Sequence, residues 1–342
     1  NWHPLYFDKA AALAIEIVVS PSNGKSTFVI ELIKDKMTTS SSLAYWQDTP
    51  TQHAIIDFVT AVSTPNSPDF IPPAERIATF DNDGTLWCER PLYIQFISAL
   101  DSLAELAEAD PALRDTQPFK AAYENDMEWL SVYTSNEKIP ELVGMLLKAF
   151  AGETQDVFET RALQWLDNAR HPRFDKLYKE LIYKPMVELL DYLRAHDFRV
   201  FICSGGGMAY VRLVSDELYG IPRENVIGSN MKLTWEYREN GPVLVRQAGI
   251  VEPFNDGPGK PINIQLHIGN PPILVGGNSD GDMAMMEFAA VGKRPFLNLL
   301  VRHDDAEREY AYDASAERVQ SAAQERNWTT ISMKNDWKTV FD

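Results

Sequence analysis

The sequence predicts an α/β protein in which a parallel β-sheet carries an inserted all-α domain. Three observations indicate this fold class. Short apolar segments of strand character alternate with segments of helical periodicity, a pattern typical of parallel sheets with right-handed crossovers. Residues 91–183 contain helical patterns but no strong strand signal. The chain has 342 residues, of which 45% are hydrophobic, so it is long enough for one large domain with an insertion or for two domains.

The first half of the chain predicts one strand between a leading helix and the helical insertion. The leading helix spans residues 43–63, and a link rich in Pro and Ser over residues 63–73 precedes an apolar strand at 76–79. Apolar residues at helical spacing then predict a series of helices. These helices lie at 92–109, 118–133, 139–150 and 154–169.

The second half predicts the remaining strands of the sheet. Residues 184–195 lead into the second strand, 198–204, and apolar spacing predicts a helix over 208–218. Asn240-Gly241 between apolar runs predicts a hairpin turn. Shorter strands are predicted at 226–227, 273–275, 296–301 and 329–332.

The run Asp81-Asn82-Asp83-Gly84-Thr85 directly follows the first predicted strand. In an extended segment, residues i and i+2 point to the same side. Asp81 and Asp83 can therefore converge on one reacting centre. The competing interpretation is a solvated loop in which the asparagine and the glycine make the turn.

Two further motifs carry groups that suit an anion. Ser204 and glycines 205–207 end the second predicted strand, where a hydroxyl and turn amides would face a phosphate at a helix N-terminus. Lys260 opens another predicted helix. A lone lysine is usually a solvated surface charge, and Pro261 stands where a P-loop needs Ser or Thr. Lys260 is therefore a candidate site residue only because of its position in the order of the motifs.

The fourth motif is an acidic, glycine-rich turn after the strand at 273–275. It reads Gly276-Gly277-Asn278-Ser279-Asp280-Gly281-Asp282. All four motifs are expected to follow strands, and the carboxyl ends of parallel strands meet at one edge of a sheet, where ligands bind.

Taken in this order, the four motifs resemble those of the haloacid dehalogenase (HAD) superfamily of hydrolases. The resemblance covers residues 75–300 and is greatest to the phosphoserine-phosphatase-like branch, which carries a helical cap between the first two motifs. The stretch 302–312 also resembles the tail of bacterial HAD proteins that open with Asp-Asn-Asp-Gly-Thr-Leu-Trp. The resemblance implies a Rossmann-like core over residues 37–90 and 184–342, with a cap over 91–183.

The resemblance further implies a phosphatase that acts through an aspartyl-phosphate. Asp81 would attack phosphorus, and Asp83 would protonate the leaving oxygen and then activate water. Because a phosphate ester is anionic, a divalent ion would neutralise it, and Mg²⁺ prefers oxygen ligands. The expected Mg²⁺ ligands are Asp81, the Asp83 carbonyl, Asn278 and Asp282, with Asp280 either a ligand or just outside them. The expected phosphate-binding residues are Thr85, Ser204, Gly205 and Lys260.

Asn278 is the main departure from the family pattern, because the first Asp of the fourth motif is usual there. An amide oxygen can bind Mg²⁺ but brings no charge, so Asp280 or Asp282 would compensate or the metal affinity would be lower. A non-catalytic binding protein with a HAD fold is therefore one alternative, and a phosphotransferase or phosphomutase is another. The second aspartate, Asp83, argues against a dehalogenase. Glu89 and Arg90, just past the first motif, would either contact the substrate or pair with each other.

The composition limits the partners. The net charge of −17 argues against broad binding of nucleic acid or of anionic membranes, since both need excess Lys and Arg. We therefore expect a small phosphorylated metabolite as the ligand. The two cysteines, Cys88 and Cys203, cannot form a disulfide framework and are interpreted as buried packing thiols.

The N-terminal region has no convincing signal peptide, and no stretch reaches transmembrane length. These features predict a cytoplasmic protein. The first methionine is Met37, so residues 1–36 are interpreted as an extra N-terminal segment that lies upstream of the natural start or was added to it.

Overall fold

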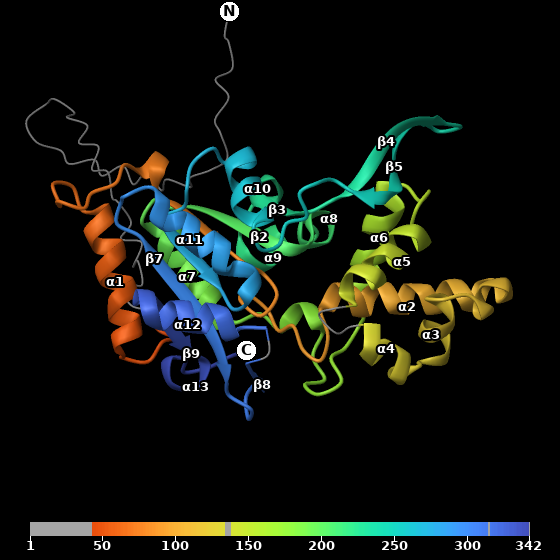
Figure 1. The fold of residues 1–342 in the computed structure, drawn as a ribbon, viewed down its shortest axis with the longest axis horizontal. Helices are drawn as coiled ribbons and strands as arrows, with labels where there is room; N and C mark the ends of the chain where they lie inside the picture. The colour runs from red at the N-terminus through yellow and green to blue at the C-terminus, as the bar shows by residue number, and fades with distance from the viewer. Residues whose placement is uncertain (1–42, 134–137, 314, 342) are drawn as a thin grey trace, which may run out of the picture. The chain divides into compact units, whose positions relative to one another are not determined.

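The computed structural model describes residues 43–133, 138–313 and 315–341 (Figure 1). The segment 1–36, interpreted as extra, lies outside these ranges. No helix within them is long and apolar enough to cross a membrane.

A seven-stranded sheet forms the centre of the described chain, in the order β3-β2-β1-β6-β7-β8, with β9 also pairing with β7. All pairs are parallel except β7 with β8. The predicted α/β class with a parallel sheet is therefore confirmed. The strands are β1 (Ile77–Phe80), β2 (Arg199–Gly207), β3 (Val226–Ser229), β6 (Leu274–Gly277), β7 (Leu297–Asp304), β8 (Ala311–Tyr312) and β9 (Thr329–Ser332).

Helices cover both faces of this sheet, because successive strand residues point to opposite sides. The helices α1 (Pro50–Ser63), α7 (Lys184–Ala195) and α13 (Met333–Asp336) share one apolar cluster with Phe80 of β1. The opposite cluster contains Val275 of β6. It is completed by α10 (Gly259–His267), α11 (Met283–Val291) and α12 (Glu317–Arg326).

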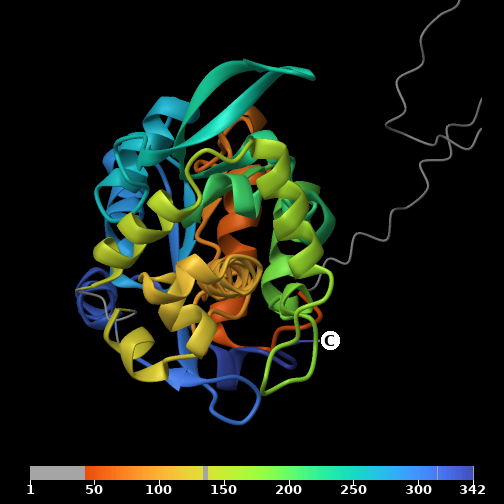
Figure 2. The same ribbon diagram turned by 90° about the vertical axis from the view of Figure 1, so that its right-hand side faces the viewer.

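The segment between β1 and β2 is helical, as predicted. Its helices are α2 (Ile94–Ala109), α3 (Phe119–Glu124), α4 (Met127–Tyr133), α5 (Ile139–Ala149) and α6 (Gln155–Leu166). Figure 2 shows α2, in orange, nearly end-on with shorter helices of the insertion around it. These helices build a core of their own from Leu100, Leu103, Leu130, Leu142, Leu146 and Phe150.

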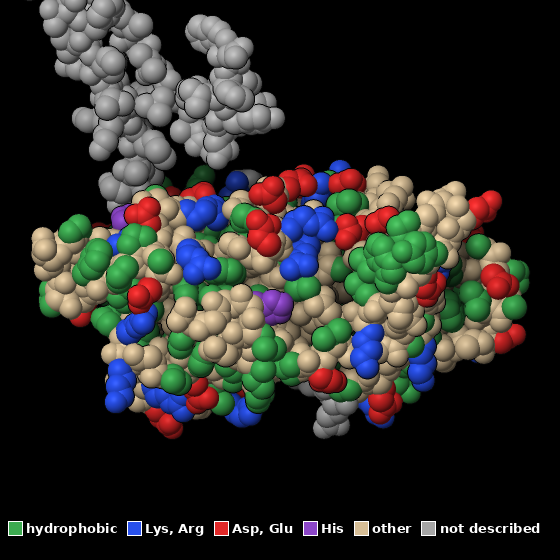
Figure 3. Space-filling view, turned by 90° about the horizontal axis from the view of Figure 1, so that it is seen from above, with side chains coloured by type: hydrophobic (Ala, Val, Ile, Leu, Met, Phe, Trp, Pro, Cys, Tyr) green, Lys and Arg blue, Asp and Glu red, His purple; other side chains and the backbone are tan. Residues whose placement is uncertain are grey.

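A two-stranded hairpin, β4 (Met231–Arg238) and β5 (Gly241–Ile250), turns at Asn240-Gly241 as the sequence predicts. Gly241 has φ 111°, a conformation that favours glycine. The hairpin pairs with the insertion: the Gly152 amide donates to the Arg246 carbonyl at 2.8 Å, and the Arg246 amide donates to the Glu153 carbonyl at 2.9 Å. Exposed apolar side chains gather on it, toward the right of Figure 3; they include Leu233, Trp235, Tyr237 and Leu244.

Several predicted elements differ in their limits. The leading helix begins at Pro50, because the Thr49 hydroxyl caps it by accepting from the Gln52 amide. The helix predicted over 118–133 breaks at Asn125, which adopts a left-handed conformation with φ 52°. The helix predicted over 208–218 is two short helices, α8 (Met208–Val211) and α9 (Ser215–Tyr219). The short strand β8 was not predicted.

Candidate active site

Three of the predicted motifs lie at the carboxyl ends of adjacent strands. Strand β1 pairs with β2 on one side and with β6 on the other, so the turn 81–85 lies between Ser204 and Asn278. The Asp81 amide donates to the Gly276 carbonyl at 2.9 Å, which holds the start of this turn against β6. This is the edge of a parallel sheet at which ligands bind.

Lys260 does not follow a strand, contrary to the prediction. It lies at the start of α10, after the loop that leaves the hairpin. Lys260 is nevertheless buried, with 2% of its surface exposed, and its Nζ donates to Asp81 at 2.7 Å and to Asp282 at 2.6 Å. This ammonium group of the third motif therefore joins Asp81 of the first motif to Asp282 of the fourth.

The charges in this group depend on one another. Burial raises the pKa of Asp81 well above its usual value, although Lys260 opposes this. Burial by itself lowers the pKa of Lys260, but Asp282 and Asp81 outweigh it and hold that pKa well above the ordinary value. The second Asp282 oxygen accepts from the Asn278 amide at 2.9 Å and from the Ser279 amide at 3.0 Å. Asp282 therefore fixes both the lysine and the turn.

Asp83 lies between the Trp87 indole and the glycine turn of β2. One of its oxygens accepts from the Trp87 indole at 2.9 Å. The other faces the glycine turn of β2, since a Cβ added at Gly206 would lie 3.5 Å from it and 3.2 Å from the Ser204 hydroxyl. Burial raises the pKa of Asp83 to about 6. Both protonation states are therefore accessible near neutral pH.

Asn278 lies beside the backbone of the turn 81–85. Its Oδ1 accepts from the Thr85 hydroxyl at 3.1 Å, and its Nδ2 lies 3.4 Å from Glu89 Oε1. Gly84 has φ 74°, and a Cβ there would be only 2.1 Å from Asn278 Nδ2. Glycine is therefore required at position 84, both by conformation and by space. Thr85 is fully buried, its hydroxyl donates to Asn278, and its backbone amide donates to the Asn82 carbonyl at 3.2 Å.

Asp280 points out of the group that surrounds Lys260. One oxygen accepts from the Val319 amide at 2.8 Å, and the other pairs with Arg318 at 3.1 Å. The Asp280 carboxylate is thus bound by residues of α12, whereas the Asp282 carboxylate accepts a hydrogen bond from Lys260. Of the two acidic candidates that could compensate for Asn278, the structure brings only Asp282 to Asp81.

Glu89 and Arg90 do not pair with each other in the described chain. Glu89 is 6% exposed and accepts from the Tyr312 hydroxyl at 2.7 Å. The Arg90 guanidinium lies over the Tyr312 ring, 4.0 Å from its centroid. Glu89 lines the cavity described below, and Arg90 is not among the lining residues.

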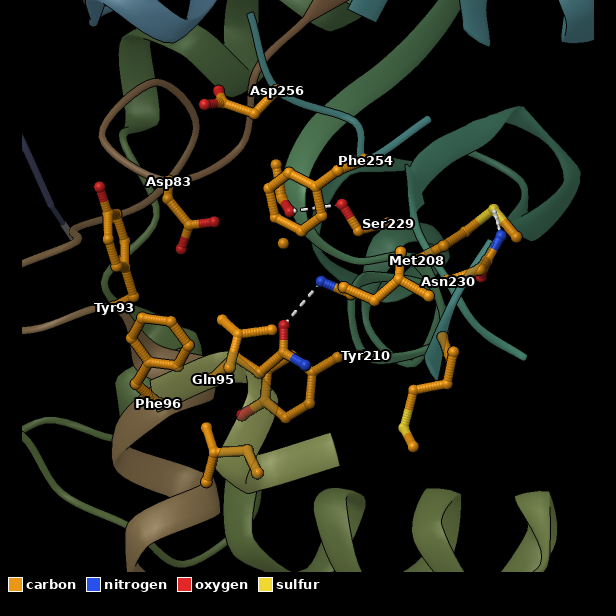
Figure 4. A pocket seen from close by; sticks show the side chains of 18 of the residues that line it. Asp83, Tyr93, Gln95, Phe96, Met208, Tyr210, Ser229, Asn230, Phe254 and Asp256 are labelled. Carbon is orange, nitrogen blue, oxygen red and sulfur yellow. Dashed lines mark hydrogen bonds between the residues drawn. The ribbon is translucent and has the colours of Figure 1, made fainter. Parts of the chain in front are cut away.

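A cavity of about 900 Å³ opens in front of Asp81 and Asp83 (Figure 4). Its floor includes Lys260 and the glycine turn 205–207, and Gly205 there is the expected phosphate-binding residue. The Ser204 hydroxyl accepts from the Gly206 amide at 3.0 Å, so it supports the turn. The walls come from the insertion and the hairpin and are largely apolar; they include Phe96, Ile139, Val143, Leu147, Phe158, Met231, Leu233, Leu244 and Ile250.

Sequence reasoning missed two polar residues of this cavity. Gln95, in the first turn of α2, accepts from the Gly207 amide at 2.7 Å and joins the insertion to the glycine turn. Asp256 lies across the cavity from it, near Gly205 and Gly281. Neither stands out in the sequence: Gln95 is an uncharged residue within a helix, and Asp256 precedes a lysine motif that was interpreted through Lys260 alone.

The residues around Asp81 fit Mg²⁺ by their chemistry. The donors are oxygens, from the carboxylate of Asp81, the amide of Asn278 and the backbone of the turn. Among the described residues, no three His, Cys, Asp or Glu side chains lie close enough together to hold a metal ion on their own. A site with few protein ligands suits Mg²⁺, which keeps several of its waters.

Comparisons with known proteins agree with this description. A conserved protein of unknown function from Anaerococcus prevotii has a similar structure, with a TM-score of 0.51 and 15% identity over 82% of this chain and 91% of that chain. A protein of unknown function from Bordetella pertussis has a TM-score of 0.48 and 14% identity over 75% of this chain and 98% of that chain. A phosphoserine phosphohydrolase-like protein from Francisella tularensis has a TM-score of 0.39 and 14% identity over 75% of this chain and 94% of that chain. The first of these supports the fold.

The search of curated proteins found no significant match. The family model described as haloacid dehalogenase-like hydrolase matches residues 78–287, which is more than half of the chain and includes all four motifs. The chain therefore belongs to the haloacid dehalogenase-like hydrolase family.

Proposed function

We propose that this protein is a Mg²⁺-dependent phosphatase that hydrolyses a phosphomonoester through an aspartyl-phosphate. One observation carries the proposal: two carboxylates two residues apart face one cavity, and the first of them accepts a hydrogen bond from a buried lysine. This arrangement supplies a nucleophile, a proton donor and a fixed positive charge within one site.

The chemistry would proceed in two displacements. An Asp81 oxygen attacks phosphorus while the bond from phosphorus to the ester oxygen breaks, and the leaving oxygen takes the proton of Asp83. Asp83, now ionised, accepts a proton from water, which attacks phosphorus and releases Asp81 and phosphate. Lys260 offsets the charge on the phosphoryl oxygens.

Mg²⁺, when bound, would neutralise the substrate phosphate. Asp81, the Asp83 carbonyl and Asn278 are the residues that would hold it, and Asp282 would keep Lys260 and the turn in place. A pKa of about 6 for Asp83 suits a group that must act as acid and then as base near neutral pH.

The cavity supports a substrate with an apolar alcohol part. Three of its four arginines are already in ion pairs: Arg223 with Glu159, Arg246 with Glu153 and Arg318 with Asp280. The fourth, Arg212, donates to the Val226 carbonyl at 3.2 Å. The remaining wall area is mostly aliphatic and aromatic. A cavity of about 900 Å³ is at the upper end of the usual range of roughly 300–1,000 Å³ for ligand sites. A phosphomonoester larger than a triose or serine phosphate would fill it better.

The test is a panel of phosphomonoesters, including p-nitrophenyl phosphate and alkyl phosphates, assayed with Mg²⁺ and with EDTA. We expect turnover only with Mg²⁺, and none in Asp81→Asn, because an amide is too poor a nucleophile. Turnover by Asp81→Asn near the wild-type rate would refute the mechanism. If the wild-type protein hydrolyses none of the esters at high Mg²⁺, the alternative of a non-catalytic binding protein is favoured.

A further inference from the structure

The fourth motif lacks a negative charge at position 278. Asn278 holds the place of an acidic residue, and the nearby Asp280 is committed to Arg318 and the Val319 amide. Asp282 is fully buried, with one oxygen on Lys260 and the other on two amides of its own turn. None of the carboxylates of the fourth motif is therefore free to replace the lost charge.

Glu89 is a carboxylate without a cation. It is 6% exposed, and no Lys, Arg or His of the described chain lies within 4 Å of its oxygens. Both of its hydrogen bonds, from the Tyr312 hydroxyl and the Asn278 amide, end on Oε1. Its other oxygen has no hydrogen-bond partner in the described chain, and the residue lines the cavity. A largely buried carboxylate that has no cation beside it and opens to the cavity through one oxygen suits a cationic ligand.

The position of Glu89 matches that of the absent charge. A Cβ built on Gly84 would lie 2.9 Å from the Glu89 carboxyl carbon and 2.1 Å from Asn278 Nδ2. The Glu89 carboxylate and the Asn278 amide therefore meet over the same glycine, directly after Asp83. Asp83 and Glu89 both line the cavity beside this glycine.

We propose that Glu89 supplies the acidic metal ligand that Asn278 does not provide. This inference rests on the proposed Mg²⁺-dependent function and assigns one of its ligands to a residue outside the family's four motifs. Asn278 then contributes by orienting Glu89 through its Nδ2, and the net charge of the metal site stays that of a site with an aspartate at position 278.

The tail 302–312 holds this arrangement in place. Tyr312 donates to Glu89, and His303 stacks on the Tyr312 ring with centroids 4.3 Å apart. His303 Nε2 lies 2.8 Å from the Gly84 carbonyl, and its Nδ1 lies 3.2 Å from the buried carboxylate of Glu309. Tyr312 is thus a positioning residue for Glu89.

The experiment measures Mg²⁺ binding without substrate, by isothermal titration calorimetry of the full chain, with Mn²⁺ electron paramagnetic resonance as a second readout. We expect Tyr312→Phe, which removes the support of a ligand, to weaken Mg²⁺ binding by up to about 10- to 100-fold, and Glu89→Gln, which removes the ligand charge, to weaken it at least as much. Moving the charge, in Glu89→Gln combined with Asn278→Asp, should restore binding to within a few fold of wild type. Asp280→Asn is the matched control, with an equal charge change in the neighbouring turn and no expected loss.

The outcomes separate the inference from the function on which it rests. Wild-type protein that binds no Mg²⁺ would refute the metal requirement itself. Wild-type binding with unchanged affinity in Glu89→Gln would refute the inference alone, and a raised KM in that variant would then make Glu89 a substrate contact. A larger loss in Asp280→Asn than in Glu89→Gln would assign the charge to the fourth motif. Thermal melts in EDTA confirm that each variant is folded.

Discussion

Replacing Lys260 with methionine tests the electrostatic centre of the site. The ammonium donates to two carboxylates, Asp81 and Asp282, and all three groups are buried. Removing one member of a buried ion pair leaves an uncompensated charge and typically costs about 3–5 kcal/mol. We therefore expect Lys260→Met to lower the free energy of unfolding by about this amount in the metal-free protein.

The pH dependence of this loss follows from Asp81. Burial already raises its pKa and Lys260 opposes that rise, so removing the lysine raises the pKa further. A carboxyl group whose pKa is raised on folding costs stability as the pH rises from its unfolded pKa to its folded pKa, by up to about 1.4 kcal/mol per pH unit. The difference between Lys260→Met and wild type should therefore be smaller at pH 5 than at pH 8.

The assay is urea unfolding in EDTA at both pH values, followed by tryptophan fluorescence. Lys232→Met is the matched control, because Lys232 is exposed on the hairpin and its replacement should change stability by no more than about 0.5 kcal/mol. Equal losses in the two variants would show that Lys260 is a solvated surface charge. A loss in Lys260→Met that does not change with pH would refute its coupling to Asp81.

Three other predictions concern the reaction. Asp83→Asn should lower kcat roughly a hundredfold to ten-thousandfold for alkyl phosphates and less for p-nitrophenyl phosphate, whose leaving group needs no proton; equal losses would indicate a structural role. Because the pKa of Asp83 is about 6, its acid form is lost above that pH, so kcat/KM for alkyl phosphates should fall there. Trp87→Phe removes the indole hydrogen bond that stabilises the ionised Asp83, so this fall should move to higher pH. In pH–rate profiles, a fall that stays in place in Trp87→Phe would count against this assignment. Phe158→Ala should raise KM more for octyl phosphate than for methyl phosphate, and equal increases would argue against an apolar subsite.

The regular elements were predictable where local signals agree. The strand expected at 329–332 matches β9 in both limits. Residues 184–195, which were expected only to lead into the second strand, form α7, with Pro185 at the helix start. The two helices that were predicted too long fail at Asn125 and at residues 212–214, where the apolar spacing continues through a turn.

The parts of the site that were not predictable depend on contacts between distant residues. Glu89 was expected to contact substrate or to pair with Arg90, its neighbour in sequence. Instead, the Tyr312 hydroxyl donates to the Glu89 carboxylate, and the Arg90 guanidinium lies over the Tyr312 ring. Gln95 acts on Gly207, which is 112 residues away. Such pairs have no local pattern, because only the sheet order brings their elements together. The roles of the motif residues in catalysis stay predictions.

The central position of β1 has a consequence for synthesis of the chain. This strand is made early, yet its partners β2 and β6 come from far later in the sequence. His303, whose ring contacts the Gly84 carbonyl, is made later still. Contacts of such high sequence separation form slowly, because long loops must close first. While the chain is still on the ribosome, the turn 81–85 has neither its strand neighbours nor its support, whereas the insertion already holds the residues of its own core. The hydrolytic centre is therefore completed only when the last strands have been made, so a chain truncated before β7 would keep both aspartates but lack an assembled site.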